Sequence, residues 1–188
     1  MRDVGIDPHA DLVQFLHDQS QLDELLIDTI PSAVFYEPII RTKEANISVG
    51  PGSRIDSFVK LEGGERLTIG RYVHIASFAH LGIGGGTLVI EDFAAVASGA
   101  RIISGSNQLD AISMSACAPK EIQRTKASVT RLEKYSCVLC NAVVLPGVTL
   151  HTGAVLAAGG VATRDIPEWE VWGGVPAKLM FKRMLRHR

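Results

Sequence analysis

The stretch VLPGVTLHTGAVLAAGG, residues 144–160, repeats with a period that belongs to neither of the common secondary structures. Its aliphatic residues Val144, Leu150 and Leu156 stand six positions apart. Side chains return to the same side about every 3.6 residues in a helix and about every second residue in a strand. A period of six therefore indicates another regular structure, built from short segments joined by equally spaced turns.

The period continues through most of the chain. Of the fifteen positions that fall on it, fourteen are Val, Ile or Leu. The residue four positions further on is usually small or β-branched, a rule that Glu65 and Gly85 break. The fifteen positions are Val49, Ile55, Leu61, Ile69, Ile75, Leu81, Ile90, Val96, Ile102, Leu132, Val138, Val144, Leu150, Leu156 and Ala162.

The breaks in the period follow a rule as well. The spacing widens to eight residues after Leu61, nine after Leu81 and thirty after Ile102. Each break follows a third repeat, and three repeats of six make an 18-residue triangular coil, so the extra residues leave from one corner. This hexapeptide pattern is typical of a parallel β-helix, whose short strands stack coil on coil around an aliphatic interior. An accidental apolar rhythm in a β-sandwich is the disfavoured alternative.

The composition fits one soluble domain. The chain has 188 residues, and its eighteen glycines suit tight turns, because glycine adopts backbone angles that other residues avoid. A net charge of −1 creates no field that would attract nucleic acid or an anionic membrane. No run of 18 apolar residues is present to span a bilayer, and Met1–Ala10 lacks the apolar stretch of a secretory signal. We expect a cytoplasmic protein without nucleic-acid or membrane partners, and three cysteines make no disulfide framework.

The segments outside the repeat are expected to flank the β-helix. Asp7 and Pro8 are typical of a helix start, and the leucines that follow predict one or two short capping helices over residues 8–28. Pro176 predicts a second helix start, with the helix running to about Arg186. The predicted domains are a helical cap and linker (1–46), the β-helix (47–167) with a long loop (103–131), and a C-terminal segment with its helix (168–188).

The C-terminal third of the chain carries a family resemblance. Residues 141–180, NAVVLPGVTLHTGAVLAAGGVATRDIPEWEVWGGVPAKLM, resemble the hexapeptide-repeat acyltransferases, and the likeness extends over residues 47–180. RYVHIASFAHLGIGGG, residues 71–86, followed by SGSN at 104–107, is similar to the branch that acylates sugars for surface polysaccharides. The resemblance implies a left-handed β-helix that assembles into homotrimers, with acyl-CoA in the groove between neighbouring subunits.

The same resemblance implies which residues bind the acetyl-CoA donor. Small residues at the coil turns would admit the thioester, and a basic residue near the C-terminus would neutralise a phosphate. Two departures from the family are a Val138-Leu139 pair where many relatives carry a Trp, and Phe181 where some relatives have a basic residue. The matching positions are Cys140, Ala158 and Gly159 for the pantetheine arm, Thr163 and Arg164 near the adenine and its phosphates, and Lys178 for a phosphate.

Acyl transfer requires a base, and two histidines are candidates. A neutral His takes a proton from the attacking amine or hydroxyl near pH 7, while a backbone N–H at a turn stabilises the oxyanion. His74 and His80 each precede an inward aliphatic residue, and we expect them on successive corners of one coil, with His74 favoured. An ordinary exposed histidine is the alternative for each. His9, His17, His151 and His187 are expected to be surface residues.

The long loop supplies candidate substrate-binding residues. Galactoside-type acetyltransferases carry a histidine in the corresponding loop, whereas this chain has Asn107 there, and an asparagine cannot act as a base. Asn107 and Asp110 suit the binding of a sugar hydroxyl or ammonium, with a solvated loop as the equally weighted alternative. GIGGG at 82–86 lacks the Lys-Ser/Thr of a phosphate loop, and Cys137 and Cys140 lack the partners of a zinc site.

The favoured function is acetyl transfer from acetyl-CoA to a sugar. The expected acceptor is the amino group of a nucleotide-linked amino sugar in surface-polysaccharide (lipopolysaccharide) biosynthesis, and no metal is expected. A sugar O-acetyltransferase is the close alternative. A γ-type carbonic anhydrase would need three histidines converging on Zn²⁺, and only His74 and His80 lie in a suitable region. A non-catalytic scaffold that binds no acyl-CoA is the remaining alternative.

Overall fold

The computed structural model describes residues 32–184, of which Ser32–Lys182 form one compact unit. Strands make up nearly all of its regular structure, and the chain winds in turn through three sheets whose strands pair in parallel except at the C-terminal end. The predicted helices over residues 8–28 lie outside the described residues. Across residues 32–184, no helical segment has the length and apolar composition needed to span a bilayer.

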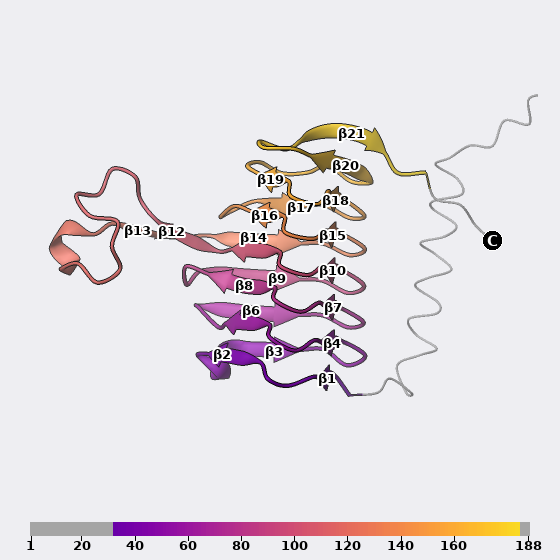
Figure 1. The fold of residues 1–188 in the computed structure, drawn as a ribbon, viewed down its shortest axis with the longest axis horizontal. Coiled ribbons are helices and arrows are strands. Elements are labelled where there is room, and N and C mark those ends of the chain that lie inside the picture. Colours follow the sequence, from indigo (N-terminus) through magenta and orange to yellow (C-terminus); the bar gives the residue numbers. More distant parts are fainter. Residues whose placement is uncertain (1–31, 185–188) are drawn as a thin grey trace, which may run out of the picture. The chain divides into compact units, whose positions relative to one another are not determined.

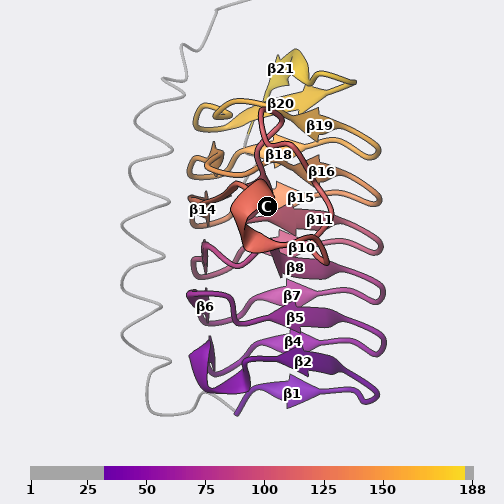
Figure 2. The same cartoon turned by 90° about the vertical axis from the view of Figure 1, so that its left-hand side faces the viewer.

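Three sheets form the faces of a triangular prism, with the coils stacked one above another (Figures 1 and 2). Sheet A consists of β1 (Val34–Phe35), β4 (Arg54–Ile55), β7 (His74–Ile75), β10 (Ala95–Val96), β15 (Cys137–Val138), β18 (Val155–Leu156), β20 (Glu170–Gly173) and β21 (Lys178–Lys182). Sheet B consists of β2 (Ile40–Thr42), β5 (Lys60–Glu62), β8 (His80–Ile83), β11 (Arg101–Ile103), β16 (Val143–Val144) and β19 (Val161–Ala162). Sheet C consists of β3 (Ile47–Val49), β6 (Arg66–Ile69), β9 (Thr87–Ile90), β14 (Val129–Leu132) and β17 (Thr149–Leu150).

Each coil passes from sheet A to sheet B to sheet C, so the prism has an A–B, a B–C and a C–A corner. Neighbouring rungs pair in parallel and in register, as when Ile75 of β7 pairs with Ile55 below it and Val96 above it. Backbone N–H and C=O groups are therefore satisfied between coils rather than within them. A short 3-10 turn, Glu44–Asn46, leads into β3.

The prism interior is filled by the residues of the predicted repeat. Fourteen of the fifteen positions are buried, and Val49 in the first coil is partly buried. The small residues four positions further on are buried too, so they form a second inward layer beside the turns. They are Ser53, Val59, Val73, Ala79, Ala94, Ala100, Ser136, Ala142, Val148 and Ala154. The predicted β-helix register is thereby confirmed.

The turns contain more than glycine. Left-handed backbone angles, which non-glycine residues rarely adopt, occur at aromatic residues on two corners. Equivalent turns of successive coils lie directly above one another, so these rings stack, an arrangement worth about 0.5–1.5 kcal/mol per pair. Phe58 and Phe78 stack on the A–B corner, and Tyr72, Phe93, Tyr135 and Trp169 form a column on the C–A corner.

All three insertions leave from the B–C corner, as the spacing predicts. The longest insertion is an arm in which β12 (Gly105–Asn107) pairs antiparallel with β13 (Thr125–Ala127). A 3-10 turn, Lys120–Ile122, lies between these two strands. Figure 1 shows the arm projecting away from the stacked coils.

The predicted C-terminal helix is wrong over the residues that the structure describes. Residues 178–182 form strand β21, which turns back and pairs antiparallel with β20. The last coil of a β-helix ends in a row of unpaired N–H and C=O groups. Pairing with β21 satisfies this edge, a demand that outweighs the helix-start signal of Pro176.

Candidate functional site

Three carboxylate–histidine pairs lie on the prism, one on each face. His74 Nε2 lies 3.0 Å from Asp56 Oδ2 on sheet A, and His80 Nε2 lies 2.7 Å from Glu62 Oε1 on sheet B. His151 Nδ1 lies 3.1 Å from Glu133 Oε1 beside sheet C. In every pair the acid precedes the histidine by 18 residues, so the two side chains come from successive coils.

The histidines stand on strands, which corrects the expected placement of His74 and His80 on corners. His74 is the first residue of β7 in sheet A, and His80 is the first residue of β8 in sheet B. Each side chain points outward because the following aliphatic residue, Ile75 or Leu81, points into the core. The two histidines therefore belong to different faces of one coil.

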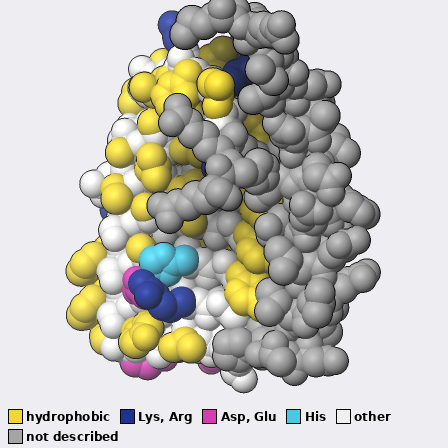
Figure 3. All heavy atoms as spheres, turned by 90° about the vertical axis from the view of Figure 1, so that its right-hand side faces the viewer, with side chains coloured by type: hydrophobic (Ala, Val, Ile, Leu, Met, Phe, Trp, Pro, Cys, Tyr) yellow, Lys and Arg dark blue, Asp and Glu magenta, His cyan; other side chains and the backbone are white. Residues whose placement is uncertain are grey.

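His74 has two competing partners at one nitrogen. Besides Asp56, its Nε2 atom lies 2.9 Å from Arg54 Nη2, and Arg54 Nε lies 2.8 Å from Asp56 Oδ1. An Arg only donates, so Nε2 either accepts from Arg54 or donates to Asp56. Burial raises the pKa of Asp56, but hydrogen bonds from His74 and Arg54 outweigh it and hold the pKa below its ordinary value. Figure 3 shows a histidine grouped with basic and acidic side chains and bordered by hydrophobic ones.

His80 has a simpler environment. Glu62 is its hydrogen-bond partner, and Lys60 Nζ lies 2.7 Å from the same Glu62 Oε1 atom. Burial raises the pKa of Glu62, but hydrogen bonds from Lys60 and His80 outweigh it and hold the pKa below its ordinary value. An ionised Glu62 accepts the Nε2 proton of a neutral His80, which leaves Nδ1 with its lone pair. Within residues 32–184, Nδ1 of His80 has no hydrogen-bond partner.

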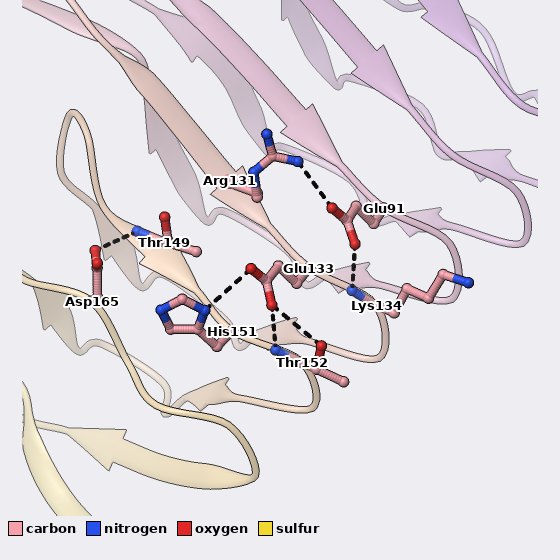
Figure 4. Close-up of polar contacts among 8 residues, drawn as sticks. All are labelled: Glu91, Arg131, Glu133, Lys134, Thr149, His151, Thr152 and Asp165. Carbon is pink, nitrogen blue, oxygen red and sulfur yellow. Dashed lines mark hydrogen bonds and ion pairs between the residues drawn. The ribbon is translucent and has the colours of Figure 1, made fainter. Parts of the chain in front are cut away.

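His151 has the same kind of carboxylate contact, although the sequence suggested an ordinary surface residue. Figure 4 shows Glu133 directed at both His151 and Thr152. Glu133 Oε2 accepts from the Thr152 backbone N–H at 2.9 Å and from its hydroxyl at 3.2 Å. The sequence signal for this pair was the triplet Arg131-Leu132-Glu133 followed after 18 residues by a histidine, which repeats the arrangement around His80.

The residues expected at the pantetheine arm gather on one corner. Cys140 and, one coil above, Ala158 and Gly159 are exposed on the A–B corner. The Gly159 N–H donates to the Cys140 carbonyl at 2.9 Å, which aligns the two turns. Gly159 has φ of 66° with open space where a side chain would stand, so the backbone is accessible there.

The residues expected at the adenine and phosphates lie further round the prism. Thr163 and Arg164 follow β19 at the B–C corner, and the Arg164 guanidinium lies 5.0 Å from the ring centre of Trp172. Lys178 is exposed at the start of β21, where it pairs with Gly173. The candidate donor residues thus lie in three places: at the A–B corner, at the B–C corner and on β21 of sheet A.

The two candidate acceptor-binding residues lie on the arm and have partners within it. The Asn107 side-chain amide donates to the Met114 carbonyl, and Asp110 forms an ion pair with Arg124. These contacts hold the loop of the arm between β12 and β13. In this conformation both side chains stabilise the arm itself.

The described residues contain no obvious metal site. Across 32–184, no group of three His, Cys, Asp or Glu side chains is placed to hold a metal ion. Cys117, Cys137 and Cys140 form no disulfide within residues 32–184. The three histidines with carboxylate partners occupy different faces, so they do not converge on a common point.

Comparisons with known proteins identify relatives with a shared chemistry. No family model matches the chain. It is 34% identical over 140 residues to the dTDP-4-amino-4,6-dideoxy-D-glucose acyltransferase of Escherichia coli, covering 73% of this chain and 72% of that one. It is 27% identical to the putative lipopolysaccharide biosynthesis O-acetyl transferase WbbJ of Escherichia coli K12, over 73% and 69% of the two chains.

Solved structures share the fold. AntD, an N-acyltransferase from Bacillus cereus solved with dTDP and 3-hydroxybutyryl-CoA, superposes with a TM-score of 0.75 at 23% identity, covering 88% of both chains. A maltose O-acetyltransferase from Clostridium difficile superposes with a TM-score of 0.54 at 18% identity, over 80% of this chain and 66% of that one. The expected left-handed parallel β-helix is thereby confirmed.

Proposed function

The chain belongs to the hexapeptide-repeat sugar acyltransferases, and we propose that it acetylates the amino group of a nucleotide-linked amino sugar in surface-polysaccharide biosynthesis. It is an acyltransferase that uses acyl-CoA as donor. The observation that carries the proposal is the 34% identity to an acyltransferase named for a dTDP-linked 4-amino sugar. The structural likeness to AntD, which has been solved with dTDP-4-amino-4,6-dideoxyglucose and coenzyme A, agrees with it.

In this proposal His80 is the general base. Its Nδ1 lone pair faces away from Glu62, while His74 shares its Nε2 atom with a cationic Arg54. His80 also lies on sheet B and follows the A–B corner that bears the candidate pantetheine residues. Glu62 is a positioning residue, because its carboxylate fixes the tautomer and orientation of the ring. His74 is the alternative base.

The reaction needs one proton transfer to the enzyme. The sugar amine attacks the thioester carbonyl carbon, forming a C–N bond and a tetrahedral oxyanion. His80 removes the proton that the nitrogen loses. Collapse of the intermediate breaks the C–S bond, and the departing thiolate of coenzyme A takes up a proton. A backbone N–H at a turn of the A–B corner would stabilise the oxyanion.

The proposal includes a cytoplasmic homotrimer with active sites between subunits. The exposed A–B corner carries small residues, and a second prism beside it would complete a narrow slot for the pantetheine arm. Asn107 and Asp110 would then act on the acceptor from the arm. Small-angle scattering should give the mass of a trimer in solution, and a monomeric mass would contradict this part of the proposal.

Sugar O-acetylation is the second candidate function. It is favoured by the likeness to WbbJ and by the shared fold with a maltose O-acetyltransferase. The γ-type carbonic anhydrase alternative requires three histidines on one metal, and His74, His80 and His151 lie on three faces of the chain, so one subunit would not supply all three. The scaffold alternative predicts no binding of coenzyme A.

The function is tested by thiol release from acetyl-CoA. The acceptors are dTDP- and UDP-linked amino sugars, the matching nucleotide sugars with a hydroxyl in place of the amine, and free hexosides. The proposal predicts release with an amino-sugar nucleotide and none with its hydroxyl counterpart. Release with hexosides alone would favour the O-acetyltransferase, and absent coenzyme A binding would favour the scaffold.

A further inference from the structure

The stacked aromatic column on the A–B corner, which consists of Phe58 and Phe78, ends with a ring that has one uncovered face. Phe58 and Phe78 stack with ring centres 5.3 Å apart and planes 4° from parallel. They are 54% and 64% exposed, high values for phenylalanine. Within residues 32–184, Phe78 stacks on no ring other than Phe58, so its second face is unpaired.

At the next turn of the corner the residue is Gly99, which has no side chain of its own to cover that face. Gly99 follows Phe78 one coil up, where its N–H donates to the Ser77 carbonyl at 3.2 Å, and Asn141 follows Gly99. The Asn141 side-chain oxygen occupies the place where a Cβ of residue 99 would stand. The corner therefore has a ring, then a glycine, and then an asparagine whose amide oxygen reaches down to the level of that glycine.

An uncompensated cation lies beside this position. Arg101 Nη1 donates to the Gly99 carbonyl at 3.0 Å, and its side chain is exposed. Arg54, Lys60 and Arg131 all form ion pairs, whereas Arg101 has no carboxylate partner among the described residues. A guanidinium donates in a fork that matches phosphate oxygens.

We propose that the base of a nucleoside diphosphate stacks on Phe78 at the level of Gly99, with its diphosphate on Arg101. A flat ring at this level continues the column, and the Asn141 amide offers a donor and an acceptor to the base edge. This site deepens the proposed function, on which it rests, by assigning the nucleotide of the acceptor to the A–B corner. Thymine is the base we test.

The position of Arg101 relative to His80, the proposed general base, favours the acceptor nucleotide over coenzyme A as the ligand of this site. Arg101 on β11 lies next to His80 on β8 in the register of these two neighbouring strands. Adjacent strands lie about 4.8 Å apart, so a sugar attached to a diphosphate on Arg101 stays on the face that carries His80. Of the candidate adenine and phosphate residues of the donor, Thr163 and Arg164 lie at the B–C corner instead, and Lys178 lies on β21 of sheet A.

The test is calorimetric titration of the full chain with dTDP, thymidine and coenzyme A. Phe78→Leu removes the flat ring face, and Phe58→Leu is the matched control. Both positions have the same left-handed φ of 65°, but the ring of Phe58 is already covered by Phe78. Base–aromatic stacking predicts that Phe78→Leu weakens dTDP by roughly 5- to 150-fold while coenzyme A binding stays unchanged. Phe58→Leu should keep the wild-type affinity.

A second variant tests the diphosphate contact without altering the aromatic column. Arg101→Gln should weaken dTDP and leave thymidine binding unchanged, because thymidine has no phosphate. Sedimentation of each variant reports whether it folds and assembles as the wild type does. Equal losses in the two leucine variants, a loss of coenzyme A affinity in Phe78→Leu, or a changed oligomeric state with unchanged dTDP affinity would each overturn the site.

Failure of this site and failure of the proposed function are separable. If amino-sugar nucleotides turn over but Phe78→Leu leaves the affinity for dTDP unchanged, the function stands and the site is refuted. If no amino-sugar nucleotide turns over while dTDP binds and depends on Phe78 and Arg101, the site stands and the function is refuted.

Discussion

Replacing His80 separates the candidate bases most sharply. His80→Asn removes the proton acceptor and keeps a planar polar group next to Glu62, while His74→Asn makes the same change on sheet A. General-base catalysis contributes about 10²–10⁴-fold, so His80→Asn should lower kcat by that factor with little change in the KM for acetyl-CoA. His74→Asn should lower kcat far less, because Arg54 competes for its Nε2 atom.

The fold should tolerate this substitution. Glu62 keeps its ion pair with Lys60 at 2.7 Å when His80 is replaced, so no carboxylate is left unpaired. Partly exposed ion pairs contribute about 0–1 kcal/mol, which sets the expected change in the free energy of unfolding. A loss of turnover with an unchanged denaturation midpoint therefore reports on chemistry rather than folding.

Steady-state kinetics of the two variants with a dTDP-linked amino sugar is the assay. Glu62→Gln is the third variant, and it should reduce kcat by roughly 10- to 150-fold, the value of a hydrogen bond to a charged group. Full activity of His80→Asn combined with a large loss in His74→Asn would refute the assignment and move the base to sheet A. Full activity of both variants would exclude both histidines.

Three further predictions follow from the core, an ion pair and the donor site. Leu132→Ala should lower the free energy of unfolding by about 2–5 kcal/mol, since Leu132 is completely buried, and urea denaturation measures this. Burial raises the pKa of Asp92, but hydrogen bonds from Arg71 outweigh burial and hold the pKa below its ordinary value. The stabilisation of the fold by this ion pair is therefore complete above the unfolded pKa of about 3.9, and it disappears as the pH falls through the lower folded value. The stability difference between wild type and Asp92→Asn should thus be largest near neutral pH and shrink below about pH 4; a pH-independent difference would contradict it. Lys178→Ala should weaken coenzyme A more than dephospho-coenzyme A in titrations, and equal losses would argue against a phosphate contact.

The interior of the β-helix could be predicted from the sequence because its period is dictated by geometry. Each coil buries one aliphatic side chain per face, so positions such as Leu81, Val144 and Leu156 had to recur at fixed spacing. The corner from which the insertions leave followed from the same count. A β-helix of this kind has almost no alternative register, since a shift of one residue would expose the whole core.

The end of the solenoid was less predictable. Lys178–Lys182 carries no strong strand signal, and its conformation is set by the unpaired edge of β20 rather than by local propensity. The aromatic turns were also missed, because Phe58 and Phe78 adopt a left-handed φ that favours glycine in isolation. Stacking between successive coils explains them, and that contact exists only in the folded chain.

In the candidate site, too, some features could be predicted from the sequence and others depend on contacts between coils. His74 and His80 could be selected from their place before inward aliphatic residues, but their carboxylate partners come from the preceding coil. The sequence predicts an ordinary surface residue at His151, although Glu133 precedes it by the same 18 residues. The spacing of one coil, 18 residues between acid and histidine, is common to all three pairs.

The chemical identity of the product tests the central claim most directly. The purified protein would be incubated with acetyl-CoA and dTDP-4-amino-4,6-dideoxyglucose, and the nucleotide sugar would be isolated for mass spectrometry and for treatment with hydroxylamine. We predict one added acetyl group that resists hydroxylamine, as an amide does. An acetyl group that hydroxylamine removes would place it on a hydroxyl, and an unmodified nucleotide sugar would contradict N-acetylation of this acceptor altogether.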